Sequence, residues 1–134
     1  MKLITYSDGG SRGNPGPAAS GAVVKKSDGE VLETLHRYLG RATNNVAEYT
    51  AIIIALEAAK RHGATEVEMR MDSELAVKQL KGEYKVKNAD LAKLFLKVKN
   101  LATEFKHVSF KHVRREQNTE ADAAVNACLD AHSK

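Results

Sequence analysis

Four acidic residues stand at the expected ends of strands and helices, where together they could hold a divalent cation. Asp8 and Asp72 each follow a short run of β-forming residues, and Glu48 and Asp122 fall in the first turns of two expected helices. If the two strands are neighbours, all four carboxylates could meet at their carboxyl ends, where sites gather in open α/β sheets. Clustered carboxylates repel unless a cation lies between them, and ligation by oxygen alone favours Mg²⁺ or Mn²⁺ over zinc.

Each acid also has a purely structural interpretation. An acid before Gly9-Gly10 could be a solvated loop residue, and an acid at a helix start can serve as a cap. The capping candidates are Asn45 with Glu48, Thr119 with Asp122, and Asp72 before Ser73. A cap is the simpler interpretation of each helix acid taken singly, whereas the joint placement of four acids favours a metal site.

The spacing of apolar residues predicts the elements that must position these acids. Strands are expected over 3–7, 20–26, 31–39, 66–71 and 107–113, and helices from 45 to about 63, over 73–80, around 91–101 and over 119–131. The Gly- and Pro-rich stretch 9–17 is expected to be a loop, so that the first strand ends at Asp8. The order predicts an α/β fold: one five-stranded mixed sheet, with three antiparallel strands followed by parallel strands, flanked by helices.

Length and composition are typical of a globular protein. The 134 residues are enough for one domain, expected to span 1–134, and 43% of them are hydrophobic. The N-terminus lacks the apolar core of a signal peptide, and the longest apolar run, Ala51 to Leu56, is too short to cross a membrane. A single cysteine, Cys128, cannot form an internal disulfide. We therefore expect a cytoplasmic monomer with no membrane association.

Positive charge is concentrated in one segment. The net charge is +4, and residues 83–115 contain nine Lys and Arg but only three acids. Such a segment is a candidate phosphate-facing surface, although a mild basic bias is also common in proteins without a polyanionic partner.

Four stretches, in the right order, resemble the type 1 ribonucleases H. They are TYSDGGSRGNPGP, ATNNVAEYTAIIIAL, MDSELAVKQL and HVRREQNTEADAAVN. Jointly these motifs are specific and cover nearly the whole chain, whereas DGG alone would be weak. The resemblance implies a ribonuclease H-like fold and an endonuclease that hydrolyses the RNA strand of an RNA–DNA hybrid.

The resemblance also implies a role for each acid. Asp8, Glu48, Asp72 and Asp122 match the family's catalytic metal ligands, which hold two Mg²⁺ ions, with Mn²⁺ as a possible substitute. In the family, the first acid bridges both ions and the products carry 5′-phosphate and 3′-hydroxyl ends. His112 has the spacing of the family's mobile histidine, which assists proton transfer or product departure; its structural alternative is a strand-end histidine without a role.

Six further residues match positions that contact the hybrid. Asn14, Asn44 and Asn45 resemble minor-groove contacts, and Arg41, Thr43 and Asn88 resemble a pocket for a DNA-strand phosphate. As alternatives, the asparagines could be turn and cap residues. The chain departs from some relatives in two ways, since only residues 82–88 replace a longer basic extension, and Glu74 stands where several relatives have glutamine. We expect a looser grip on substrate.

Three other functions compete with this interpretation. A binding domain could keep the fold without catalysis. A nuclease of the same architecture could act on double-stranded RNA or DNA junctions. A dinucleotide-binding fold is a third possibility, but Gly9 to Gly16 lacks a G-x-G-x-x-G followed at once by a helix.

Overall fold

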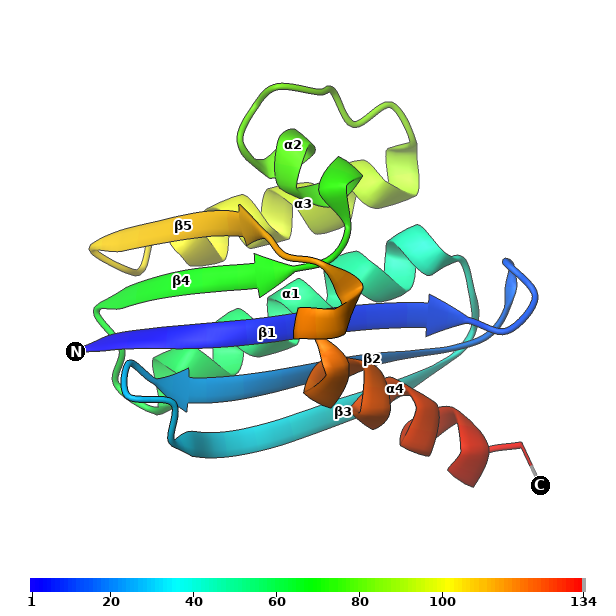
Figure 1. Ribbon diagram of the computed structural model, residues 1–134. Coiled ribbons are helices and arrows are strands. Elements are labelled where there is room, and N and C mark those ends of the chain that lie inside the picture. The colour runs from blue at the N-terminus through cyan, green and yellow to red at the C-terminus, as the bar shows by residue number, and fades with distance from the viewer. Residues whose placement is uncertain (134) are drawn as a thin grey trace.

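The computed structural model of the protein describes residues 1–133, in which five strands form one mixed sheet (Figure 1). The strands are β1 (Lys2–Ser11), β2 (Gly16–Lys26), β3 (Val31–Ala42), β4 (Glu66–Met71) and β5 (His107–His112). Their order across the sheet is β3-β2-β1-β4-β5. β1 pairs antiparallel with β2 and β2 with β3, while β4 pairs parallel with both β1 and β5. This arrangement confirms the predicted fold class and differs from the all-parallel sheet of a dinucleotide-binding fold.

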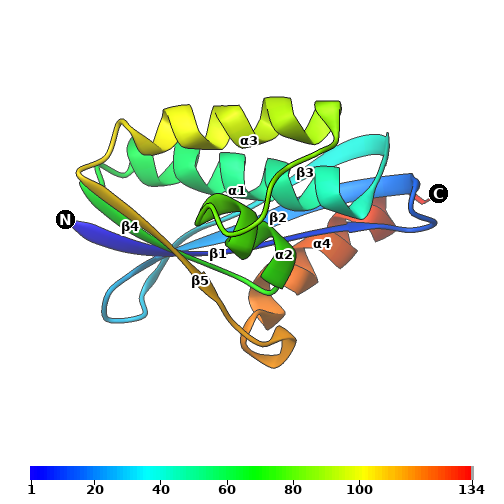
Figure 2. The ribbon, with the colours of Figure 1, turned by 90° about the horizontal axis from the view of Figure 1, so that it is seen from above.

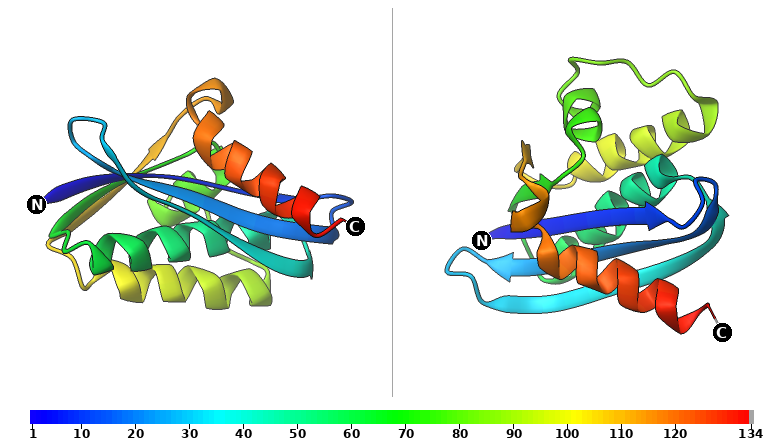
Figure 3. Two further views of the ribbon diagram at one scale, coloured as in Figure 1. Left: turned by 90° about the horizontal axis from the view of Figure 1, so that it is seen from below. Right: turned by 45° about the vertical axis from the view of Figure 1, so that its right-hand side comes forward.

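Helices cover both faces of the sheet (Figures 2 and 3). α1 (Asn44–Arg61) and α3 (Ala89–Ala102) lie side by side on one face, and α4 (Thr119–Ala131) lies alone on the other. α2 (Glu74–Leu80) follows β4, and a short 3₁₀ helix, η1 (Arg115–Gln117), connects β5 to α4. α2 and α3 together form the crossover from β4 to β5, which is needed because no short turn can join two strands that run in the same direction.

The main core lies between the sheet and α1. Alternate residues of β1 and β4, including Leu3 and Met69, pack against Ile52 and Leu56 of α1, and Val98 of α3 closes the cluster from outside. α1 is therefore buried between the sheet and a second helix. On the opposite face, a smaller cluster joins Ala19 of β2 to the inner side of α4, where Val125, Cys128 and Leu129 lie.

The predicted loop at 9–17 was wrong over most of its length. β1 continues to Ser11 and β2 begins at Gly16, so Asp8 lies inside a paired strand, opposite Gly21. The glycines permit close helix approach instead of a turn. A Cβ atom on Gly9 would lie 2.2 Å from the carbonyl carbon of Ala47 in α1, and one on Gly21 would lie 2.7 Å from the carbonyl oxygen of Ala121 in α4.

The capping interpretations of the acids were also wrong. Thr43 caps α1 through its hydroxyl, and Ser73 caps α2 in the same way. Asn118 is the N-cap residue of α4 and makes no side-chain cap hydrogen bond. Glu48, Asp72 and Asp122 are thus not needed to begin their helices, and their carboxylates are available for another role. No helix within residues 1–133 is long and apolar enough to cross a membrane.

Candidate active site

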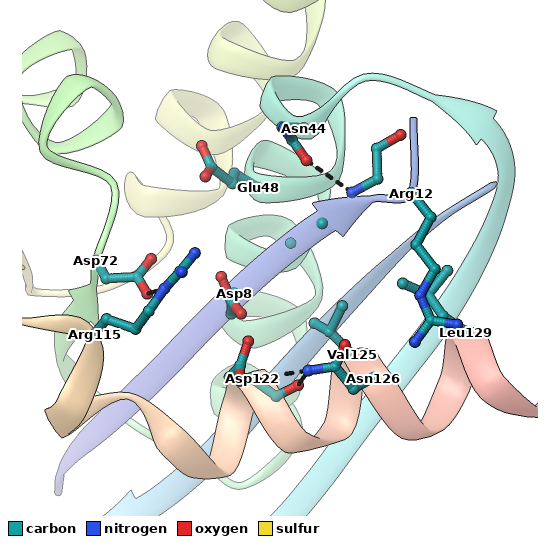
Figure 4. A pocket seen from close by; sticks show the side chains of 13 residues that line it. Asp8, Arg12, Asn44, Glu48, Asp72, Arg115, Asp122, Val125, Asn126 and Leu129 are labelled. Carbon is teal, nitrogen blue, oxygen red and sulfur yellow. Dashed lines mark hydrogen bonds and ion pairs between the residues drawn. The ribbon is translucent and has the colours of Figure 1, made fainter. Parts of the chain in front are cut away.

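A polar pocket of about 290 Å³ lies at the carboxyl ends of β1 and β4 and contains all four predicted acids (Figure 4). β1 supplies Asp8, α1 supplies Glu48, α4 supplies Asp122, and Asp72 follows directly after β4. The lining is completed by Gly9, Gly10, Ser11, Arg12, Asn44, Arg115, Val125, Asn126 and Leu129. Four elements that are distant in sequence therefore converge on one place.

Close backbone approaches at two glycines lie next to the acids of the pocket. Gly9 lies next to Asp8 and touches Ala47, the residue before Glu48, so α1 brings Glu48 close to the strand. Gly21 lies opposite Asp8 and touches Ala121, the residue before Asp122. The two glycines thus allow one acid to approach Asp8 from each face of the sheet.

Asp8 is the most perturbed of the acids. The residue is 9% exposed. Burial, followed by the charge of Asp72 and the nearby carboxyl groups of Asp122 and Glu48, raises its pKa to about 8. The carboxyl of Asp122 lies within hydrogen-bonding reach. The negative charges of all three other acids therefore act on Asp8, which makes it the central member of the set.

Glu48 is shifted in the same direction. Burial raises the pKa of Glu48 to about 7; the Ser73 hydroxyl and the positive charge of Arg115 lower it, and the charge of Asp72 raises it. Without a cation, burial of the Asp8 and Glu48 carboxyl groups disfavours their ionised forms.

Asp72 forms a long ion pair with Arg115. Its side chain is 12% exposed, and Oδ2 lies 4.0 Å from Nε of Arg115. That separation is too long for a hydrogen bond, and within residues 1–133 this buried oxygen has no hydrogen-bond partner. A carboxylate oxygen that lines a pocket and has no hydrogen-bond partner is available to bind a cation.

Asp122 is positioned by its own helix and by Asn118. Asn126, one turn along α4, donates from Nδ2 to the backbone oxygen of Asp122 at 3.1 Å and to its Oδ2 at 3.4 Å. Asn118 is 1% exposed and donates to the carbonyl oxygen of Ser7, the residue before Asp8. The start of α4 is therefore fixed directly to β1.

The donor set fits a divalent cation. Carboxylate oxygens are the ligands that Mg²⁺ and Mn²⁺ prefer, and a cation would relieve both the repulsion at Asp8 and the unpartnered oxygen of Asp72. Across residues 1–133, no three His, Cys, Asp or Glu side chains are already arranged to hold one ion. Within the described residues, the four acids share one pocket without forming a preassembled ligand cluster.

The structure places His112 outside this pocket lining. His112 ends β5, is exposed, and pairs in register with Met71, the residue before Asp72. Glu74, the first residue of α2, forms an ion pair of 2.8 Å with Lys78, so its extra negative charge is partly neutralised. The charge of His112 also acts on Glu74, lowering its pKa after the larger effect of Lys78.

Two of the three predicted asparagines, Asn14 and Asn44, are linked by hydrogen bonds beside the pocket. Oδ1 of Asn44 accepts from the backbone N–H of Ser11 at 2.7 Å, and Oδ1 of Asn14 accepts from the backbone N–H of Asn44 at 3.0 Å. These bonds fix the orientation of both amides, so their Nδ2 groups remain as donors. Asn45 is exposed.

Two of the three residues of the predicted phosphate pocket, Thr43 and Asn88, are helix caps. Thr43 caps α1, and Oδ1 of Asn88 caps α3 by accepting from the backbone N–H groups of Asp90 and Leu91. α1 and α3 begin at the same end of the molecule (Figure 2). Arg41 and both caps lie outside the acid-lined pocket, and of the nine basic residues in 83–115, that pocket includes Arg115.

Several pocket residues were missed from the sequence. Asn126 follows Asp122 by four positions, a helical spacing that could have identified it. From the sequence, Arg115 belongs to the basic segment 83–115 and Arg12 to the expected loop 9–17. No local pattern points to either arginine, because each reaches the pocket through connections between elements.

The chain is similar to known proteins in sequence and in overall structure. A family model described as reverse transcriptase-like matches residues 6–128. A bifunctional protein of Mycobacterium tuberculosis is 48% identical over 98% of this chain and 36% of its own length. The crystal structure of RNase H1 from Halobacterium salinarum has a TM-score of 0.95 at 44% identity, covering 98% of this chain and 99% of that one.

A further solved structure contains a nucleic acid. LC11-RNase H1, in complex with an RNA/DNA hybrid, has a TM-score of 0.94 at 44% identity, covering 98% of this chain and 99% of that chain. The present chain spans about a third of the mycobacterial proteins that it matches, 36% of their length.

Proposed function

Because this chain belongs to the ribonuclease H family, type 1, we propose that it is an endonuclease that hydrolyses the RNA strand of RNA–DNA hybrids. The observation that carries the proposal is the convergence of Asp8, Glu48, Asp72 and Asp122 on one pocket. The relative LC11-RNase H1, solved with an RNA/DNA hybrid, supports the choice of substrate. All four acids come from one chain, so the site needs no second copy.

We assign Asp8, Glu48, Asp72 and Asp122 as the ligands of two divalent cations, Mg²⁺ or Mn²⁺. The bound ions supply positive charge at the scissile phosphate and lower the pKa of the attacking water. Asp8 would be the central ligand of the set, because it lines the same pocket as Glu48, Asp72 and Asp122 and the charges of all three act on it. The lack of a side chain at Gly9 and Gly21 lets the backbone next to Glu48 and Asp122 come close to the sheet.

His112 is the candidate group for proton transfer or product departure. An imidazole can both accept and donate a proton, and the end of β5 places this one beside the strand that leads to Asp72. Its exposure leaves it free to approach a bound phosphate. In this role His112 assists the reaction, while the four acids hold the metal ions.

The asparagines at the rim are the candidate residues for distinguishing RNA from DNA. The 2′-hydroxyl both donates and accepts hydrogen bonds and lies in the wide minor groove of a hybrid. Asn14 and Asn44 each use Oδ1 to hold the backbone, and this leaves an oriented Nδ2 donor for a ribose. Arg41, Thr43 and Asn88 are assigned to the DNA-strand phosphate.

Cleavage of an end-labelled hybrid, with and without Mg²⁺, tests the function. We expect Mg²⁺-dependent cutting of the RNA strand only, with 5′-phosphate and 3′-hydroxyl ends, which ligation of the purified fragments can identify. Double-stranded RNA and DNA junctions of the same sequence test the competing nuclease function.

Asp8→Asn and Asp72→Asn are the matched inactive controls, because each removes one ligand charge and keeps the side-chain shape. We expect both variants to fold and to bind the hybrid without cutting it. Undiminished turnover by either variant would rule out the two-metal assignment, and hybrid binding without cleavage by the wild type would favour a non-catalytic binding domain.

A further inference from the structure

The acid pocket already contains a positive group, the guanidinium of Arg115. This residue begins η1, between β5 and α4, and its side chain reaches from there toward Asp72 (Figure 4). Nε lies 4.0 Å from Oδ2 of Asp72, and the same charge acts on Glu48. Arg115 thus stands beside two of the four acids.

Arg115 is held only weakly. Its side chain is 84% exposed, and within residues 1–133 its guanidinium makes no hydrogen bond to another side chain. Exposed ion pairs of this kind contribute little to stability. The second arginine of the lining differs, because Arg12 is bound to Asp130 of α4 at 2.7 Å. Arg115 can therefore leave the acids at low cost, whereas Arg12 is occupied elsewhere.

The oxygen that Arg115 faces is a preferred atom for a metal. Oδ2 of Asp72 is buried and has no hydrogen-bond partner within the described chain, so a cation that contacted it directly would gain more than the distant guanidinium does. Two cations that share the same carboxylates repel each other, and the penalty is reciprocal: each weakens the binding of the other.

We propose that Arg115 is an internal counter-cation that stands beside Asp72 while metal is absent and competes with the divalent ion for that carboxylate. Metal binding then releases the guanidinium from the acids. This inference rests on the proposed function, because it assumes that these acids bind metal. It assigns Arg115 the role of balancing the charge of Asp72 while metal is absent.

Calorimetric titration with Mg²⁺, without nucleic acid, tests this competition. Arg115→Ala should bind Mg²⁺ about fivefold more tightly than the wild type, at the low end of typical coupling between two ligands. Its metal-free form should melt at a lower temperature, and its melting temperature should rise more when Mg²⁺ is added. Arg115→Lys keeps the charge and should remain close to the wild type.

Arg114→Ala is the matched control. Arg114 is the adjacent exposed arginine and does not line the pocket, so this variant removes the same net charge without removing the counter-cation. Its Mg²⁺ affinity should stay within about twofold of the wild type, because salt screens a distant exposed charge.

Three results would overturn the inference. Equal Mg²⁺ affinity of the Arg115→Ala and Arg114→Ala variants would show that the charge acts only at long range. Weaker binding by Arg115→Ala would show that Arg115 holds Asp72 in place as a ligand. If the wild type bound no Mg²⁺ by calorimetry or by melting temperature, the proposed metal site would fail together with the competition.

Discussion

Asn118 donates a hydrogen bond of 2.9 Å from its side-chain amide to the carbonyl oxygen of Ser7. The bond joins the N-cap residue of α4 to the residue that precedes Asp8, across 111 positions of sequence. Two acids from opposite ends of the chain, Asp8 and Asp122, are thereby held in one fixed relation. Asn118 is 1% exposed, so the bond is protected from water.

We expect Asn118→Ala to lower the free energy of unfolding by about 1–3 kcal/mol, because a buried carbonyl oxygen would lose its partner. Cleavage should fall further than stability explains, since Asp122 would lose its position relative to Asp8. Urea denaturation and hybrid cleavage measure the two effects. Asn100→Ala, an exposed asparagine on α3, is the control and should change neither; an equally harmless Asn118→Ala would contradict this role of the bond.

Gly9→Ala should destabilise the protein by about 1–3 kcal/mol or prevent folding, because the new methyl group would overlap the backbone of α1 at Ala47. Gly10→Ala is the neighbouring control, since its Cβ would meet only a methyl group of Val125 at 3.5 Å, an ordinary contact. Thermal unfolding of the two variants compares them. Similar melting temperatures would mean that α1 can shift away from β1 without cost.

The stability of the metal-free protein should fall as pH rises, because folding raises the pKa of Asp8 from 3.8 to about 8 and that of Glu48 from 4.5 to about 7. A carboxyl shifted upward stabilises the fold fully below its unfolded pKa, and this contribution is lost as pH rises through the folded value. Asp8→Asn removes the larger effect. Its advantage in melting temperature over the wild type should therefore grow between about pH 4 and pH 8.

Calorimetry in a chelating buffer at several pH values measures this trend. Asp90→Asn, which changes an exposed acid outside the pocket, is the control and should show no growing advantage. Mg²⁺ should raise the melting temperature of the wild type most at the upper end of the range, since it binds the ionised acids. A pH-independent difference in melting temperature between Asp8→Asn and the wild type would mean that folding does not raise the pKa of Asp8 in the metal-free protein.

His112→Ala should reduce cleavage by about 10²-fold or less, because a positioned proton-transfer group contributes about 10²–10⁴-fold and the metal ions provide most of the catalysis. Single-turnover cleavage separates this effect from slow product release. His107→Ala, at the other end of β5, is the control. Complete inactivity of a folded His112→Ala protein would instead make His112 a ligand or a structural residue.

A hybrid with a run of four or more ribonucleotides should be cut, whereas a duplex with a single embedded ribonucleotide should be cut poorly, because we expect several successive 2′-hydroxyls to be contacted. Asn45→Ala should lower cleavage at an unchanged melting temperature, since Asn45 is exposed. Asn14→Ala should also lower the melting temperature, because Oδ1 of Asn14 holds the backbone of Asn44. Efficient cutting at a lone ribonucleotide would refute this basis of selectivity.

The sequence by itself determined the order of the elements and the acids that their ends carry. Alternation of apolar residues identified β4, and helical spacing of apolar residues identified α1 and α3, because both patterns depend on which side of each element is buried. The rule that parallel strands end at one edge then brought Asp8 and Asp72 together, as their adjacent strands confirm. Both conclusions rest on local periodicity and simple topology.

Only the tertiary structure decided what surrounds those acids. The sequence predicts a loop at Gly9 and a strand at Gly21. The structure shows that both glycines let a helix touch the sheet, which is a contact between distant segments. The caps at Thr43 and Ser73 were ambiguous because several nearby residues had suitable side chains. Arg115 reaches Asp72 through a connection with no periodic pattern. Such contacts depend on distances between elements, and these are set by the packing of the whole chain rather than by any local stretch of it.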